Sequence, residues 1–172
     1  MRSTGEKRKM AIRSYLERSM GMTDAVWERH ANPWSGWSRI IIPPLFALAI
    51  WSRAWIGWMA IIPITLVVLW TWWNPRAFPA PKSHDAWMTR GVLGERIWLK
   101  RHERPIPVHH AKAAKYLAII SGLGLPPLAW GLWANDIWAV VAGITFISMG
   151  KLWFLDRMVW LFQDTSEISR GN

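Results

Sequence analysis

Residues 40–73 read IIIPPLFALAIWSRAWIGWMAIIPITLVVLWTWW, and this stretch decides the fold class of the chain. The one charged residue of this stretch is Arg53, which lies in a short polar break between two apolar arms. Each arm falls within the roughly 17 to 25 residues that an α-helix needs to cross the hydrocarbon layer of a membrane. Hydrocarbon offers the backbone no hydrogen-bond partner, so helix is the expected form even with three prolines in the stretch. We therefore predict a transmembrane helical hairpin over residues 34–73.

A second pair of apolar runs, residues 116–133 and 137–155, is divided by the break Ala134-Asn135-Asp136. The predicted fold is therefore an all-α integral membrane protein with four transmembrane helices arranged as two hairpins, the second over residues 116–155. Aligned without gaps at an offset of 83, Pro43-Pro44-Leu45 falls on Pro126-Pro127-Leu128. This agreement indicates a parallel internal repeat, with chance similarity between Trp-rich segments as the alternative.

Charge is unevenly distributed along the chain, whose net charge is +10. Lys and Arg gather before the first apolar run and between the second and third, and this alternation is typical of loops that stay on the cytoplasmic side. We predict an integral protein of the cytoplasmic membrane, with both termini cytoplasmic and anionic lipid headgroups as partners. Binding to nucleic acid is not expected, because no basic helix is free of an adjacent membrane segment.

Tryptophan is abundant, with 16 residues, while cysteine is absent. Absence of cysteine excludes disulfides, thiolate metal sites and a cysteine nucleophile. Many of the tryptophans lie at the ends of apolar runs, where amphipathic rings anchor helices at the membrane surface. The predicted anchors, with one arginine that reaches toward phosphates, are Trp34, Trp37, Arg39, Trp51, Trp55, Trp72, Trp73, Trp133, Trp138 and Trp153.

Three further segments complete the predicted organisation. Residues 1–33 form a basic N-terminal region with an amphipathic helix around residues 10–20, for which a solvated arm is the alternative. Residues 74–115 form a cytoplasmic basic loop with a surface helix from His84 to about Arg101, capped by Ser83. Residues 156–172 form an interfacial C-terminal tail.

Four segments carry a likeness to a known family: WERHANPWSGWSRI at residues 27–40, IWSRAWIGW at 50–58, WNPRAFPAP at 73–81 and RGVLGER at 90–96. With them, residues 23–104 resemble a domain-of-unknown-function family of small multi-pass membrane proteins from bacteria and archaea. The resemblance implies a membrane location. It implies no activity and no site residues.

Histidines supply the candidate ligands for a cofactor. His109 and His110, with His84 in the same loop, have the chemistry to bind haem, (bacterio)chlorophyll or a metal. Adjacent histidines on a regular helix point about 100° apart, so we do not expect both to bind one metal ion. The alternative is that all three are ordinary polar residues of the membrane surface.

Polar residues beside the predicted spans are candidate contacts for lipid headgroups or for a partner. Lys151 lies well inside an apolar arm, where a charge indicates either a functional site or a side chain that snorkels to the surface. The other candidates are Arg29, His30, Asn32, Arg90, Glu95 and Arg96. No carboxylate pair lies within a span, and the motifs GxSxG, HExxH and the P-loop are absent.

No catalytic residues are therefore predicted, and an enzyme is not expected. The hypothesis favoured by the sequence is an accessory or scaffold subunit of a larger membrane complex, photosynthetic or respiratory, that packs through tryptophan-rich transmembrane faces. A small oligomeric transporter or channel is one alternative. A subunit that binds haem, a pigment or a quinone is another.

Overall fold

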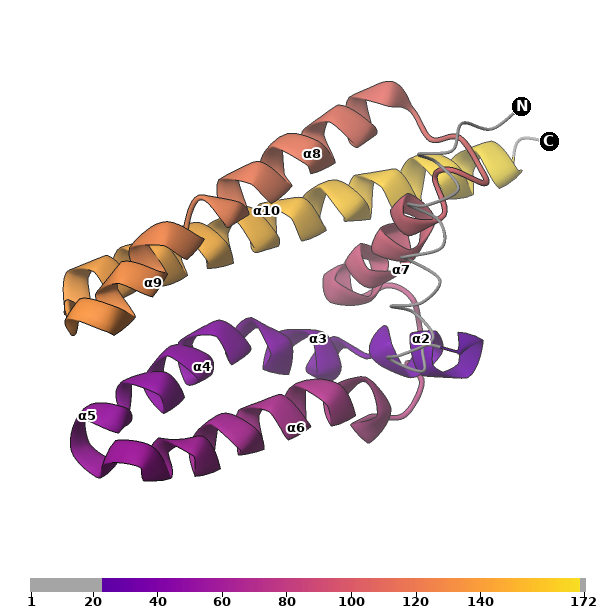
Figure 1. The fold of residues 1–172 in the computed structure, drawn as a ribbon. Coiled ribbons are helices and arrows are strands. Elements are labelled where there is room, and N and C mark those ends of the chain that lie inside the picture. Colours follow the sequence, from indigo (N-terminus) through magenta and orange to yellow (C-terminus); the bar gives the residue numbers. More distant parts are fainter. Residues whose placement is uncertain (1–22, 171–172) are drawn as a thin grey trace, which may run out of the picture.

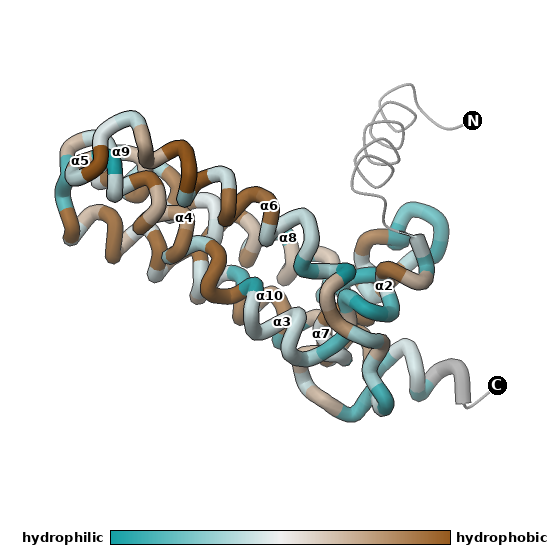
Figure 2. Tube along the Cα trace, turned by 90° about the horizontal axis from the view of Figure 1, so that it is seen from below, coloured by the Kyte–Doolittle hydropathy of each residue, from teal (hydrophilic) through white to brown (hydrophobic). Residues whose placement is uncertain are grey.

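The computed structural model describes residues 23–170, with side chains to residue 167, and this part of the chain is helical without strands. The amphipathic helix expected around residues 10–20 lies outside the described residues. Two long pairs of helices run side by side and are joined at one end by two shorter helices (Figure 1). Apolar residues follow the long helices, and polar residues gather at the end where the short helices lie (Figure 2).

The first pair is built from residues 33–77. Helices α3 (Pro33–Ile40) and α4 (Ile42–Trp51) run outward, and α6 (Ile61–Ala77) runs back beside α4 (Figure 1). The reversal uses α5 (Arg53–Ile56) and the 3₁₀ turn Gly57–Ala60. Gly57 has a φ of 58°, a left-handed value that a residue without a Cβ adopts without strain.

Short side chains set the start of this pair. The Asn32 carboxamide oxygen accepts a hydrogen bond from the Trp34 amide at 2.9 Å, and Pro33 follows at the first helical position. These two residues set the start of α3. At the other end, α6 continues through Asn74 and Pro75 to Ala77. The Arg76 side chain donates to the Trp72 carbonyl at 2.6 Å.

The second pair is built from residues 108–170. Helices α8 (Val108–Gly122) and α9 (Leu125–Ala134) lie along one unbroken helix, α10 (Ile137–Arg170). Asn135 makes the turn with a φ of 55°, and the Asp136 carboxylate caps α10 by accepting from the Trp138 amide at 2.9 Å. Helix α10 has 34 residues and no break at Asp156, where the sequence suggested the membrane surface.

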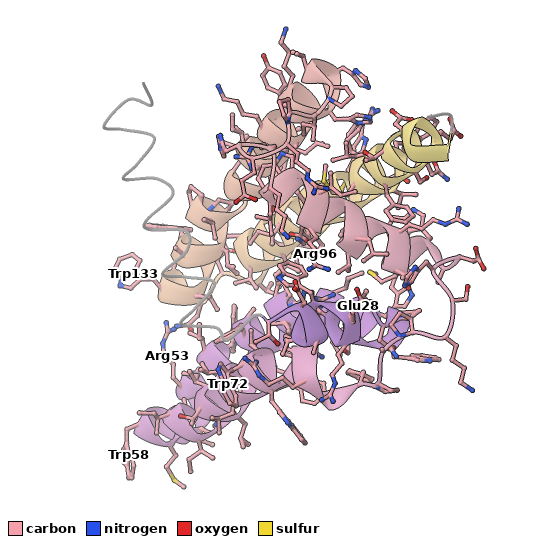
Figure 3. All side chains as sticks on the ribbon, turned by 90° about the vertical axis from the view of Figure 1, so that its right-hand side faces the viewer. Glu28, Arg53, Trp58, Trp72, Arg96 and Trp133 are labelled. Carbon is pink, nitrogen blue, oxygen red and sulfur yellow. The ribbon has the colours of Figure 1, made fainter. Side chains whose placement is uncertain are left out.

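Helices α4 and α9 correspond under the offset of 83. Both have ten residues, both carry two prolines at their start, and both lead into the turn of their pair. The two turns differ in chemistry, since the first is the nine-residue connection 52–60 with Gly57 and the second uses Asn135 and Asp136. At the turns, the Arg53 guanidinium binds the carbonyls of Leu132 and Trp133, with a distance of 3.3 Å to the latter (Figure 3).

Two short helices form the polar base. Helix α2 (Asp24–His30) is capped by Thr23, whose hydroxyl accepts a hydrogen bond from the Val26 amide at 3.3 Å. Helix α7 (Trp87–Leu99) starts three residues later than expected, because the Ser83 hydroxyl accepts from the Asp85 amide and so stabilises a turn instead of a helix start. Arg96 of α7 forms ion pairs with Asp24 and Glu28 of α2 (Figure 3).

Small residues let α7, α8 and α9 approach α10 closely. At Gly91, a Cβ would lie 3.3 Å from the Leu155 carbonyl oxygen, and at Gly94 it would overlap the Met158 backbone. Gly124, Gly143 and Gly150 likewise have backbone or side-chain atoms of the facing helix where a Cβ would lie, whereas Gly122 has none within 4 Å. Glycines therefore allow the helix backbones of the second pair to pack closely against each other.

Three helical stretches of the described chain are long and apolar enough to cross a membrane: Pro33–Ala77, Val108–Ala134 and Ile137–Glu167. Their apolar surfaces are little covered by the rest of the protein. In the most apolar window of Pro33–Ala77, 6% of residues are buried, against 22% in each of the other two. These features are consistent with an integral membrane protein.

Replacement of Gly94 tests the packing of α7 on α10. We expect Gly94→Ala to lower the free energy of unfolding by about 1–3 kcal/mol, because the added methyl group overpacks the contact with the Met158 backbone. Gly122→Ala is the matched control, since it adds the same group in open space. The melting temperature of the detergent-solubilised protein measures both. Equal melting temperatures for the two variants would contradict the close contact.

Candidate functional site

A cavity of about 200 Å³ lies where α3, α7 and α10 meet, next to the end of α2. This is far above the roughly 10–15 Å³ that one water needs. Its wall is polar on one side and apolar on the other. The lining residues are His30, Gly36, Arg39, Ile40, Pro43, Met88, Glu95, Ile147, Ser148, Lys151, Leu152 and Leu155.

Local structure explains why these side chains meet. Helix α7 can lie close to α3 because Gly36 has no Cβ, and the Met88 side chain occupies that space. The Thr89 hydroxyl donates to the Ala31 carbonyl at 2.8 Å and so fixes α7 to the link between α2 and α3. Glu95 is thereby brought opposite Lys151 of α10.

Lys151 and Glu95 form an ion pair, with 2.9 Å between Nζ and Oε1. The Lys151 side chain is 48% exposed and that of Glu95 22%, so the pair lies at the mouth of the cavity. The ammonium group also lies 5.0 Å from the centre of the Phe154 ring. Lys151 therefore has a carboxylate partner within the protein.

Arg39 lies deeper, and its partners are neutral. Its Nε donates to the Ser35 carbonyl at 3.1 Å, an Nη donates to the His30 carbonyl at 3.4 Å, and the guanidinium lies against the His30 ring. Within the described residues, Arg39 forms no ion pair with a carboxylate. The cavity thus holds two cationic side chains and one carboxylate.

His30 adds a base that stays neutral. Burial, together with the positive charges of Arg39 and Lys151, lowers the pKa of His30 from 6.5 to about 2. The imidazole is therefore uncharged at neutral pH. Its ring contacts the Arg39 guanidinium and adds no third positive charge to the cavity.

The predicted headgroup contacts divide into two groups. His30, Glu95 and Lys151 come together at the cavity, as does the predicted lipid anchor Arg39. Asn32 instead caps α3 and donates to the Pro79 carbonyl at 3.0 Å, while Arg29 is exposed. Arg90 pairs with Asp85 at 3.3 Å and Arg96 with α2, so Glu95, Arg90 and Arg96 do not form one surface cluster.

The predicted cofactor ligands lie elsewhere. His110 is buried, and its Nε2 lies 2.8 Å from the Asp164 carboxylate of α10. The His109 ring is 4.1 Å from the His110 ring, and one ligand atom each from His109, His110 and Asp164 lie within 4.8 Å of one another. Their ligand atoms are close enough to reach one metal ion. The expectation that the two histidines do not share an ion stays a prediction. His84 lies near Glu28 of α2 instead, at 3.9 Å.

Sequence reasoning missed Asp164 and Asn74. Asn74 is fully buried, accepts a hydrogen bond from the Ser35 hydroxyl at 2.9 Å and donates one to the Ser38 hydroxyl at 2.7 Å. These bonds join α3 to the end of α6. An asparagine that ends an apolar run, facing a segment with two serines, was the available signal. Asp164 had no such signal, since it lies 54 residues from His110.

Comparison with known proteins identifies the family. A family model described as Family of unknown function (DUF6653) matches residues 11–172. The predicted likeness to a domain-of-unknown-function family is confirmed, and the match extends well beyond residues 23–104. No curated protein and no solved structure matches the chain.

The lowered pKa of His30 predicts how the stability of the folded protein changes with pH. The unfolded chain takes up a proton on this histidine below about pH 6.5, while the folded chain does so only near pH 2. The contribution of the buried, neutral His30 to the free energy of unfolding is thus fully present above pH 6.5. Below that pH the free energy of unfolding falls by up to about 1.4 kcal/mol per pH unit. Unfolding of the wild type and of His30→Gln, measured between pH 7 and pH 4, should show a shallower dependence in the variant. Parallel curves would contradict the burial of a neutral imidazole.

Proposed function

We propose that this chain, which belongs to the family of unknown function DUF6653, is a non-catalytic accessory or scaffold subunit of a larger membrane complex. In this proposal the protein crosses the bilayer four times, as two helix pairs that repeat each other. Its polar base and both chain ends lie on the cytoplasmic side. Neighbouring membrane subunits pack against its uncovered, tryptophan-rich faces.

The four crossings are supported by the reversal at residues 52–60. Residues 33–77 are longer than one crossing requires, and α4 and α6 lie side by side after the turn (Figure 1). Basic residues concentrate at the opposite end of the pairs, which is the orientation signal expected for the cytoplasmic side. The correspondence of α4 with α9 supports the internal repeat.

One observation carries the proposal of a partner: the first helix pair is almost uncovered along its length. On α6, the exposed residues Ile62, Leu66, Leu69 and Trp73 recur at the spacing of one helix face, each with more than half of its surface open. Lipid alone can cover such a face. Tryptophan, however, is among the residues that contribute most to the binding energy at subunit contacts. Trp58, at the tip, is 84% exposed and points away from the fold (Figure 3).

The described site gives no support for an enzyme mechanism. Lys151 and Glu95 neutralise each other, and Arg39 has hydrogen bonds that hold it to the backbone. That the protein is non-catalytic stays part of the proposal.

Single cysteines test the partner directly, because the native chain has none. We expect Leu66→Cys, labelled with a photoreactive maleimide in native membranes, to crosslink to another polypeptide and give one band of defined mass. Ala60→Cys is the control, since Ala60 belongs to the same segment but is 4% exposed. Mass spectrometry of the band identifies the partner. If Leu66→Cys crosslinks only to lipid, or only to a second copy of this chain, the accessory-subunit proposal is wrong.

A further inference from the structure

We infer that the cavity between α3, α7 and α10 binds the anionic headgroup of a membrane lipid, with Arg39 and Lys151 as the cationic contacts of its phosphate. The inference concerns a bound lipid rather than a protein partner. It therefore stands or falls separately from the subunit role proposed above, although it shares the membrane location.

Charge balance is the first reason. Arg39 and Lys151 are positive and Glu95 is negative, so one carboxylate serves two cations and the cavity has one positive charge in excess among the described residues. An enclosed cation without a counter-charge is costly, and an incoming anion removes that cost. His30 does not oppose the anion, since burial and then the charges of Arg39 and Lys151 lower its pKa and keep it neutral.

The donor geometry is the second reason. The Arg39 guanidinium has five N–H donors, of which one goes to the Ser35 carbonyl, one to the His30 carbonyl and one to the His30 ring. These bonds hold the planar group in place, and the remaining N–H on each Nη suits the oxygen atoms of a phosphate. The Lys151 side chain is half exposed, so it has room to turn from Glu95 toward the same oxygen atoms.

The shape of the cavity selects a lipid over a free ion. Along the helices, His30, Arg39 and Lys151 come on the side of the polar base, whereas Pro43 of α4 and Ile147 of α10 come one turn further out on the apolar lengths. A molecule that fills both parts has a charged head and an apolar tail. Basic pockets between membrane helices on the cytoplasmic side are the sites where anionic headgroups bind.

Native mass spectrometry of the detergent-purified full-length protein tests this inference. Phosphatidylglycerol, phosphatidylcholine and inorganic phosphate are each added at equal concentration. We expect a retained adduct with phosphatidylglycerol alone. Arg39→Gln should weaken it by about tenfold or more, the range for losing charge-assisted hydrogen bonds. Arg104→Gln, the same change at an exposed position outside the cavity, should leave it unchanged.

A second variant keeps the test decisive if Arg39→Gln is poorly folded. Ser148→Phe keeps every charge and fills the cavity, so it should also abolish the adduct while the melting temperature is retained. Equal binding of phosphatidylglycerol by the wild type and Ser148→Phe would overturn the site. An adduct with inorganic phosphate that displaces phosphatidylglycerol would overturn the lipid assignment and leave a site for free oxyanions.

Discussion

The approach of α7 to α10 through glycine is the contact on which the arrangement of the base depends. Gly91 and Gly94 bring α7 against the backbone of Leu155 and Met158, at a distance that any side chain would increase. This contact sets the position of Glu95 relative to Lys151. It also sets the position of Met88, whose side chain packs on Gly36 where α7 meets α3. The cavity is therefore a consequence of backbone packing, and its charged residues are carried into place by it.

Apolar surface is the second constraint. A water-soluble fold covers its apolar helix faces, but here the first pair leaves nearly all of them open. The polar interactions that hold this pair lie at its ends, with Asn74 between Ser35 and Ser38 at one end and Arg53 on the carbonyls of α9 at the other. A chain built this way leaves the apolar helix faces between the two ends to be covered by lipid or by neighbouring subunits.

The sequence predicted the helical class well, because long apolar stretches such as those on either side of residue 53 can be recognised without any knowledge of distant contacts. The predicted start of α7 was three residues too early, because Ser83 stabilises a turn instead of capping the helix. The meeting of Arg39, Glu95 and Lys151 could not be predicted, since it depends on how α7 packs between distant helices. Hydropathy likewise suggested a boundary at Asp156, yet Trp87 donates to that carboxylate at 3.1 Å and α10 passes through unbroken.

The length of α10 couples the bilayer to the base. At 1.5 Å per residue its 34 residues extend about 51 Å, whereas the hydrocarbon layer is about 30 Å thick. In the proposed orientation, several turns therefore project into the cytoplasm, and α7 and the start of α8 pack on that projecting part, which includes Met158 and Asp164. A thicker or thinner bilayer changes the tilt of such a rod. The whole cytoplasmic base turns with it, so membrane thickness sets the angle at which this protein presents its polar end.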